Sequence, residues 1–457
     1  MSRKTRPYLF YDTTASVCAE CKRRVEAKIL IKDDCVYLEK WCPEHGLARS
    51  LISDDVEYYK LCREVYVKAP EMPERFNTAM KEGCPWDCGL CPDHMQHSCV
   101  SVVEITEKCN LRCPVCYAGS GPEVGRHLSM SEIEAMLDTV VANEGEADVV
   151  QISGGEPTLH PDFFAVLDAA RARPIRHLMV NTNGLRLARE PEFAARLAAY
   201  KPGIEVYLQF DSLRDEVLME LRGATLATIH RQALEALERH NISTTLVMTV
   251  KGGVNDGEIG EVIRHGLQWR CVRGVTLQPV EDAGRNEGFD PACHRLPLSA
   301  VRRAVAEQSG VFSLDDLLPV PCNPDTLAMA YAIRRGDPFN QLTPLTRHIG
   351  PEVLLNGPGN TISFERDAAF KEKLFRLFAT NLAPEGQAAC LSDLLCCLPK
   401  IKAPDLSYEN VFRVLVVRFM DLHDLDLRAL KKSCVHMARP EGRMIPFETW
   451  NLFHRAL

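Results

Sequence analysis

Cysteines are concentrated in the first quarter of the chain: 12 of the 19 fall among the first 116 of 457 residues. The N-terminus is basic and no apolar secretory core follows it, so we expect a cytoplasmic protein. Thiols in the cytosol are kept reduced, which makes disulfides a poor explanation for so many cysteines. Thiolates are good ligands for zinc, iron and iron–sulfur clusters. The distribution therefore predicts metal binding, and the spacing indicates which kind.

The composition excludes several classes of protein. Hydrophobic residues make up 46% and charged residues 25% of the chain, which is typical of a folded protein with more than one core. No apolar run is long enough to span a membrane. The formal net charge of −8 argues against a nucleic-acid-binding surface. We expect a small-molecule or lipid substrate, no nucleic acid, and at most transient contact with a membrane surface.

Four segments are expected along the chain. A metal-binding domain occupies residues 1–68, and a second cysteine-rich segment occupies 69–99. An α/β core follows at 100–285, and a mostly helical region at 286–457 supplies substrate contacts and further ligands.

The core alternates apolar strand patterns with amphipathic helical patterns, as repeated βα units do. Strands are expected at 102–106, 148–153, 177–181, 204–210, 244–250 and 275–279. A capping box formed by Ser129 and Glu132 starts a helix to about residue 143. Helical spacing recurs at 162–172, 191–200, 227–240 and 257–270. Six units are too few to close an eight-stranded barrel, so the pattern predicts a partial (βα)6 barrel.

The first candidate metal site pairs Cys18 and Cys21 with Cys42 and His45. Segments 28–32 and 36–41 are expected to form a hairpin around residues 33–34. Two ligand pairs about twenty residues apart on a small β scaffold are typical of a zinc ribbon or a rubredoxin-like site. Cys35 is an alternative fourth ligand to His45, and spacing leaves zinc and iron equally open.

The second candidate is the glycine- and proline-rich loop that carries Cys84, Cys88 and Cys91. Three thiolates on such a loop can bind three corners of a [4Fe–4S] cluster, and zinc is the alternative. Cys99 or a distant cysteine would complete the set. We interpret the nearby His94 and His97 as exposed loop residues.

The third candidate is Cys109, Cys113 and Cys116, directly after the strand expected at 102–106. The carboxyl end of a strand is where α/β sheets bind ligands. A Cys-x3-Cys-x2-Cys loop holds three irons of a [4Fe–4S] cluster and leaves the fourth iron without a protein ligand. By analogy with zinc sites, an open position indicates catalysis.

This triplet and the motifs after it resemble the radical S-adenosylmethionine (SAM) superfamily. Residues 154–157 read Gly-Gly-Glu-Pro after the second strand, 181–184 read Asn-Thr-Asn-Gly after the third, and 209–212 read Gln-Phe-Asp-Ser after the fourth. The residue before the last cysteine, often aromatic in the superfamily, is Val115, and Tyr117 follows instead. The resemblance implies SAM contacts from Tyr117, Gly154, Gly155, Glu156, Pro157, Asn181, Asn183, Gln209 and Asp211.

The order of all these motifs is similar to the archaeal tetraether lipid synthase family, which includes a hydroxymethyl-dihydropterin methyltransferase, and to its bacterial relatives. That resemblance implies three [4Fe–4S] clusters and one mononuclear iron. By position, Cys322 would join the second site, and a further cluster would take Cys390, Cys396, Cys397 and Cys434. Thr326 and Glu448 stand where the family leads us to expect cysteines. We therefore expect fewer clusters than in the archaeal enzymes, and a different substrate.

Three functions are considered. The first is reductive cleavage of SAM to a 5′-deoxyadenosyl radical that abstracts hydrogen from an unactivated carbon, for C–C bond formation on lipid chains. The second is radical methylation of a pterin or another small heterocycle, and the third is a non-catalytic iron–sulfur electron carrier. The first two require a reducing protein such as ferredoxin or flavodoxin. We interpret the phenylalanine- and leucine-rich stretch at 364–378 as the apolar face of a helix in the core. We interpret the acidic residues at 421–426 as a solvated turn.

Overall fold

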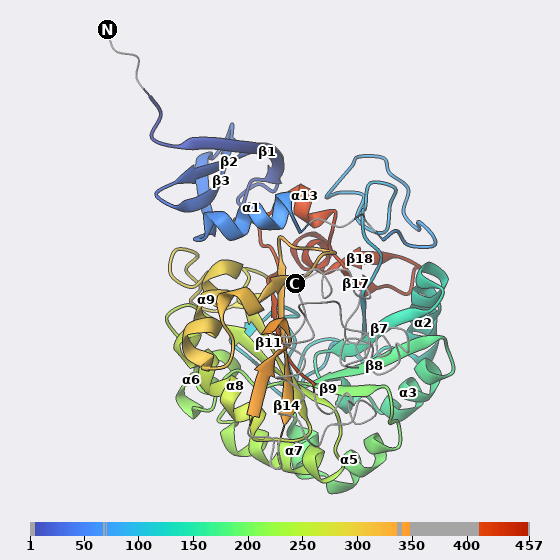
Figure 1. Ribbon diagram of the computed structural model, residues 1–457. Helices are drawn as coiled ribbons and strands as arrows, with labels where there is room; N and C mark the ends of the chain where they lie inside the picture. The colour runs from blue at the N-terminus through green and yellow to red at the C-terminus, as the bar shows by residue number, and fades with distance from the viewer. Residues whose placement is uncertain (1–4, 67–68, 70, 336–340, 348–410, 456–457) are drawn as a thin grey trace, which may run out of the picture.

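The structure is a computed structural model, which describes residues 5–66, 69, 71–335, 341–347 and 411–455 (Figure 1). The N-terminal part is a four-stranded antiparallel sheet in the order β1-β2-β3-β4, followed by helix α1 (Val56–Glu64). Its strands are β1 (Leu9–Val17), β2 (Arg24–Lys32), β3 (Cys35–Cys42) and β4 (Gly46–Ser53).

The hairpin expected in this sheet is confirmed. Lys32 pairs with Cys35 across a two-residue turn. The turn residues Asp33 and Asp34 have φ values of 50° and 55°, the left-handed conformation that a tight hairpin of this twist requires. Aspartate tolerates this conformation better than most residues do.

A parallel sheet forms the core. Its six strands are β5 (Val100–Thr106), β7 (Ala147–Gly154), β8 (Ile175–Thr182), β9 (Ile204–Gln209), β10 (Thr244–Val250) and β11 (Val272–Pro279). Every neighbouring pair is parallel. Valine and isoleucine runs dominate these strands because both faces are buried. All six strands expected from the sequence are present, and the partial barrel of α/β type is confirmed.

Helices cover the outside of the curved sheet (Figure 1). They are α2 (Met130–Glu144), α3 (Phe163–Arg171), α4 (Leu185–Arg189), α5 (Pro191–Ala198), α6 (Asp215–Arg222), α7 (Ala227–Arg239), α8 (Ile259–Leu267) and α9 (Leu298–Ser309), with short 3-10 turns η1 (Pro157–Leu159), η2 (Asp256–Glu258), η3 (Leu314–Asp316) and η4 (Leu345–Arg347). The expected capping box is present: the Ser129 hydroxyl accepts from the Glu132 amide, and the Glu132 carboxylate accepts from the Ser129 amide.

The C-terminal region adds strands at both edges of the sheet. Strand β16 (Val411–Val417) pairs in parallel with β11, and β14 (Leu327–Arg335) continues that edge. At the other edge β17 (Val435–Ala438) pairs in parallel with β5. The smaller elements are β6 (Val115–Cys116), β12 (Arg285–Asn286), β13 (Leu318–Pro319), β15 (Gln341–Pro344), β18 (Met444–Pro446), α13 (Leu427–Leu430), α14 (Phe447–Thr449) and the π-helical turn η8 (Trp450–His454). In the described part of the chain, no helix has both the length and the apolar character needed to cross a membrane.

The acidic segment after β16 is not a solvated turn, and that expectation is wrong. Asp421, Asp424 and Asp426 are all buried. Asp421 and Asp424 form ion pairs with Arg295, and Asp426 accepts a hydrogen bond of 2.6 Å from the Thr14 hydroxyl of β1. Partners from distant parts of the chain neutralise these carboxylates, and the last contact joins the N-terminal sheet to the C-terminal region.

Candidate active site and metal centres

The Cys109–Cys116 loop leaves the carboxyl end of β5, as expected. Arg285 of β12 holds its backbone: the guanidinium donates to the Cys113 carbonyl at 2.6 Å and to the Ser120 carbonyl at 2.7 Å. Burial raises the pKa of Cys109 to about 12, so this thiol ionises only when a metal draws off its proton. The arrangement presents three thiols from one anchored loop.

The three sulfurs of the triplet are not packed as the ligands of a single ion are. The structure brings two other groups of donors so close that all ligand atoms of a group lie within 4.8 Å of one another, and among the described residues the triplet is not such a group. A [4Fe–4S] cube attaches each thiolate to a different iron, which keeps the sulfurs well apart. Three thiols on one anchored loop are the donor set that such a cube takes, so the residue types present fit the cluster.

The Gly-Gly-Glu-Pro turn packs directly against the cysteine loop. The Gly155 amide donates to the Thr106 carbonyl at 2.8 Å, and the Glu156 amide donates to the Lys108 carbonyl at 2.9 Å. A Cβ on Gly154 would lie 2.1 Å from the Thr106 carbonyl oxygen, and Gly154 has a φ of 130°. Only glycine fits this approach, so the turn depends on it.

The Glu156 side chain points into the protein. Its carboxylate accepts hydrogen bonds from the Thr158 hydroxyl at 2.6 Å and the Thr182 hydroxyl at 2.8 Å. It also accepts from the Asn183 amide at 2.8 Å. Burial raises the pKa of this carboxyl group. The carboxylate that the resemblance assigns to SAM therefore also ties two strand ends together.

Side-chain amides form a row along the carboxyl ends of the strands. Gln209 donates to Asn181 at 2.7 Å, and Asn181 donates to the Ser153 hydroxyl at 3.0 Å. On β11, Gln278 donates to the Tyr207 hydroxyl at 3.1 Å. Asn181, Gln209 and Gln278 line a cavity with free hydrogen-bonding capacity for a polar ligand.

Arg222, at the end of α6, is a site residue that the sequence analysis missed. Its guanidinium binds the Asp211 carboxylate and donates to Gln209 at 3.0 Å. Burial raises the pKa of the Cys113 thiol, and the nearby Arg222 charge partly offsets that rise. Arg222 also lines the cavity. An arginine on an ordinary amphipathic helix carries no local signal, but its position one helix after the Gln-Phe-Asp-Ser motif is a clue.

A cavity of about 240 Å³ occupies the barrel interior. It extends from the triplet at the carboxyl ends of the strands to Cys99, which precedes β5. Amides from the parallel strands line one part, together with Glu281 beyond β11. Apolar side chains of the C-terminal strands line another, including Leu327, Met329, Leu415, Val417 and Val435. The cavity thus has a polar side and an apolar side.

The N-terminal donors come together as expected. The Cys21 and Cys42 sulfurs are 3.8 Å apart, and His45 Nδ1 lies 3.5 Å from Cys18 and 3.6 Å from Cys42. Against desolvation, hydrogen bonds from the Glu44 backbone and the His45 side chain lower the pKa of Cys42 to about 6. The group contains His45 and not Cys35, which lies at the opposite end of β3.

The second candidate site has Cys88 and Cys91 buried and Cys84 partly exposed. Burial raises the pKa of Cys84 to about 12, and the Cys88 thiol donates to the Thr449 hydroxyl at 2.6 Å. In the described part of the chain these three sulfurs, like the triplet, do not form a compact donor group of the kind that binds a single ion.

Cys322 does not join the second site. Its sulfur lies 3.8 Å from that of Cys434, and Cys99 completes a compact group of three. The cause is the sheet topology: Cys99 and Cys434 precede the paired strands β5 and β17, and the turn before β14 reaches them. Hydrogen bonds from Cys434 and Cys99 lower the pKa of Cys322 well below its usual range. The sequence analysis offered Cys99 only to the second site.

Other expectations have separate outcomes. His94 is buried, which makes the expected exposed loop wrong; its Nε2 lies 2.9 Å from the Ser433 carbonyl oxygen, and burial lowers its pKa to about 4. Glu448 is buried beside the Ser433 hydroxyl, 2.9 Å away, at a position where the resemblance expects a thiol. Cys390, Cys396, Cys397 and the stretch 364–378 lie outside the described residues.

Comparison with protein families gives two matches. Residues 103–266 match the radical SAM superfamily, and this range includes the triplet, the glycine turn, Asn181 and Gln209. The protein is a radical SAM enzyme. Residues 10–54 match the "HMPTM N-terminal zinc ribbon domain", the part that carries Cys18, Cys21, Cys42 and His45. These matches exclude the electron-carrier hypothesis, and they imply a [4Fe–4S] cluster and SAM as cofactors.

One relative aligns along nearly the whole of this radical SAM enzyme. It is a 7,8-dihydro-6-hydroxymethylpterin dimethyltransferase of Methanocaldococcus jannaschii, 28% identical over 97% of this chain and 94% of its own length. Two other relatives align with a smaller share of the chain. A mycofactocin maturase of Mycobacterium ulcerans is 32% identical over 37% of this chain and 46% of its own. A GTP 3′,8-cyclase of Heliobacterium modesticaldum is 31% identical over 39% and 54%.

Solved structures of two proteins with bound S-adenosylmethionine (AdoMet) match in part. SuiB of Streptococcus suis bound to S-adenosylmethionine has 18% sequence identity and a TM-score of 0.38, with 46% of each chain covered. The protein anSMEcpe with bound AdoMet and a peptide has 17% identity and a TM-score of 0.36, over 46% of this chain and 58% of its own.

Proposed function

We propose that this radical SAM enzyme methylates a small heterocycle of the pterin type. The observation that carries the proposal is the polar side of the cavity, where Asn181, Gln209, Gln278 and Glu281 face the space beside the triplet. A pterin ring presents several donors and acceptors in one plane, and amides and a carboxyl group are suited to pair with them. The relative that aligns along 97% of the chain is named for such a substrate, which supports the same choice.

We propose that the chain's own residues bind and orient both reactants. Cys109, Cys113 and Cys116 hold three irons of the cluster, which when bound supplies the electron that splits SAM. Gly154 and Gly155 let the backbone approach the amino group of SAM. Arg222 presents a fixed positive charge beside Cys113, which attracts the carboxylate of SAM. The barrel wall excludes water from the space between SAM and substrate, which protects a reactive radical.

C–C bond formation between lipid chains, the first function considered above, is the second candidate. The apolar side of the cavity favours it, because Leu327, Met329, Leu415 and Val417 offer no hydrogen bonds and suit an alkyl chain. The polar side argues against it, since the free donors and acceptors of buried amides facing an alkyl chain would be left unpaired, at a cost of about 1–3 kcal/mol each.

The deciding experiment supplies the anaerobically reconstituted protein with SAM, dithionite and one of two substrates. One is 6-hydroxymethyl-7,8-dihydropterin, and the other is a lipid with two saturated isoprenoid chains. We expect 5′-deoxyadenosine to form and the pterin to gain the mass of one or two methyl groups. Linkage of the lipid chains with no change to the pterin would favour C–C bond formation and refute pterin methylation. In the cytoplasm we propose ferredoxin or flavodoxin as the electron donor in place of dithionite.

A further inference from the structure

Cys99, Cys322 and Cys434 join the two ends of the open sheet. The strand order runs from β13 and β14 at one end to β17 and β18 at the other, with the six core strands between. Cys322 lies in the turn between β13 and β14, whereas Cys434 directly precedes β17. Since the two ends share no backbone ladder among the described strands, contact between these cysteines spans the opening of the partial barrel.

The spacing of these sulfurs is that of ligands to a single ion. A tetrahedral zinc with Zn–S bonds of about 2.3 Å places its sulfurs about 3.8 Å apart. Cys322 and Cys434 have this separation, 3.8 Å, and so do Cys21 and Cys42 in the zinc ribbon. All three sulfurs lie within 4.8 Å of one another. Among the described residues, the triplet and the Cys84 loop do not form groups of this compactness.

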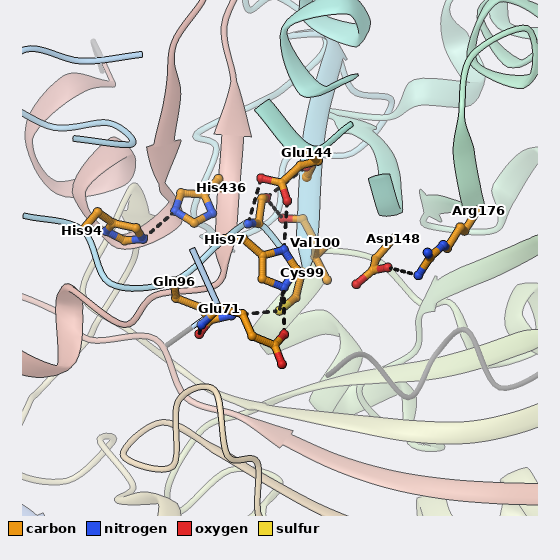
Figure 2. Close-up of polar contacts among 12 residues, drawn as sticks. Glu71, His94, Gln96, His97, Cys99, Val100, Glu144, Asp148, Arg176 and His436 are labelled. Atoms are coloured by element: carbon orange, nitrogen blue, oxygen red, sulfur yellow. Dashed lines mark hydrogen bonds and ion pairs between the residues drawn. The ribbon is translucent and has the colours of Figure 1, made fainter. Parts of the chain in front are cut away.

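His97 is positioned to be the fourth ligand. Its Nε2 lies 3.7 Å from the Cys99 sulfur, close to the separation of about 3.6 Å that a shared tetrahedral zinc would give. The ring must turn slightly to approach the other two sulfurs equally, because His97 lies just outside the compact group. Figure 2 shows the ring between Glu144 on one side and Cys99 and Glu71 on the other. A Glu71 carboxylate oxygen lies 3.4 Å from the same Nε2, a contact that the ion would replace.

Glu144, the last residue of α2, fixes the orientation of this ring. One carboxylate oxygen lies 2.8 Å from His97 Nδ1, and the other accepts from the Ser98 amide at 3.0 Å. A carboxylate bonded to one ring nitrogen directs the lone pair of the other nitrogen outward, as in the carboxylate–histidine pairs of known metal sites. The His97 side chain is 16% exposed and that of Glu144 is 5% exposed, so the pair is shielded from water.

We infer that Cys99, Cys322, Cys434 and His97 bind one tetrahedral metal ion of the zinc type, which closes the barrel by clamping its two free edges. A site with four protein ligands has no open position and is structural. Its surroundings agree, because Leu327, Val417, Val435 and their neighbours pack around the cysteines as a small apolar cluster. The ion would form the end of the cavity opposite the SAM site.

The test is a count of zinc, iron and acid-labile sulfide in full-length holoprotein. Cys434→Ser should lose about one metal ion per chain and no sulfide relative to the parent protein. The matched control is Cys271→Ser, which alters a buried cysteine outside all the donor groups and should lose no metal. Loss of iron and sulfide in equal amounts, about four of each, would show a cluster and overturn the inference. Unchanged metal content would overturn it equally.

A second measurement tests His97 without removing a thiol. In cobalt-substituted protein, His97→Cys should keep one ion at this site and gain sulfur-to-cobalt charge-transfer absorption, because a fourth thiolate replaces the imidazole. His97→Ala should lower the affinity for the ion at least tenfold. An unchanged cobalt spectrum in His97→Cys would exclude His97 as a ligand. All these readouts are independent of the reaction catalysed.

Discussion

Arg222 and Asp211 form a two-point ion pair beside the Cys113 thiol. Nη2 of Arg222 lies 2.8 Å from Asp211 Oδ1, and its Nε donates to Oδ2. Asp211 has a φ of 58°, which turns the chain sharply after β9, and the Thr249 amide also donates to its carboxylate. A single buried pair thus connects the end of β9, the end of α6 and the cysteine loop.

Replacing the arginine should destabilise the protein strongly. Arg222→Met leaves the Asp211 carboxylate buried without its cation, which costs about 3–5 kcal/mol of unfolding free energy. Arg231→Met is the control, since Arg231 forms an exposed pair with Glu235 along one helix, worth about 0.5 kcal/mol at most. Urea denaturation measures both. Equal midpoints for the two variants would show that the buried pair has no special role.

Removing the triplet should abolish SAM cleavage and leave the other metals in place. In a Cys109→Ala, Cys113→Ala, Cys116→Ala variant we expect the loss of about four irons and four sulfides per chain, because one cube is lost. Zinc content should stay at the parent value, since the ribbon site uses a separate loop. Iron analysis and a 5′-deoxyadenosine assay check this. A variant that keeps all its iron would show that the triplet holds no cluster.

Local patterns predicted much of the fold. Strands such as β10 (Thr244–Val250) are short apolar runs between turn residues, so a short window of sequence contains the signal. The hairpin at Asp33 and the capping box at Ser129 are equally local. The three cysteine loops were found because their spacing is itself the motif.

Long-range contacts account for what was missed. Cys322 and Cys434 are 112 residues apart, and their proximity follows from which strands occupy the sheet edges. From its local sequence Asp424 resembles a turn residue, but in the fold it forms an ion pair with Arg295 of another segment. His97 likewise depends on Glu144, 47 residues further on. Burial of a polar group by a distant partner leaves no trace in a local window.

His230 should make the protein sensitive to acid. Its side chain is buried against Phe210, neither ring nitrogen has a hydrogen-bond partner in the described structure, and burial lowers its pKa to about 4. The unfolded chain, with an ordinary pKa of about 6.5, binds a proton first as the pH falls. Stability is therefore lost between about pH 6.5 and 4, by about 2 kcal/mol at pH 5.

His230→Leu removes this titration. The variant should lose about 2 kcal/mol less unfolding free energy than the parent protein between pH 7 and pH 5. Urea midpoints at the two pH values measure the difference, and the comparison at pH 7 isolates any change in packing. Identical pH dependence in the two proteins would mean that His230 does not titrate in this range.

If the substrate is the proposed pterin, Glu281 should determine the affinity for it. It lines the cavity just beyond β11, and its Oε2 is buried without a hydrogen-bond partner among the described residues. Burial, with Glu448 and Asp421 nearby, raises the pKa of this carboxyl group well above its ordinary value. A protonated acid both donates and accepts, which suits an edge of a pterin ring.

In Glu281→Gln the amide keeps the size but changes the donor pattern, so one buried polar group of the complex is left unpaired. We expect KM for the pterin to rise about tenfold, since such a mismatch costs about 1–3 kcal/mol. Glu287→Gln, on the exposed loop that follows, is the control and should leave KM unchanged. SAM cleavage without substrate should continue at the parent rate in both variants, and an unaltered KM in Glu281→Gln would remove this residue from the substrate site.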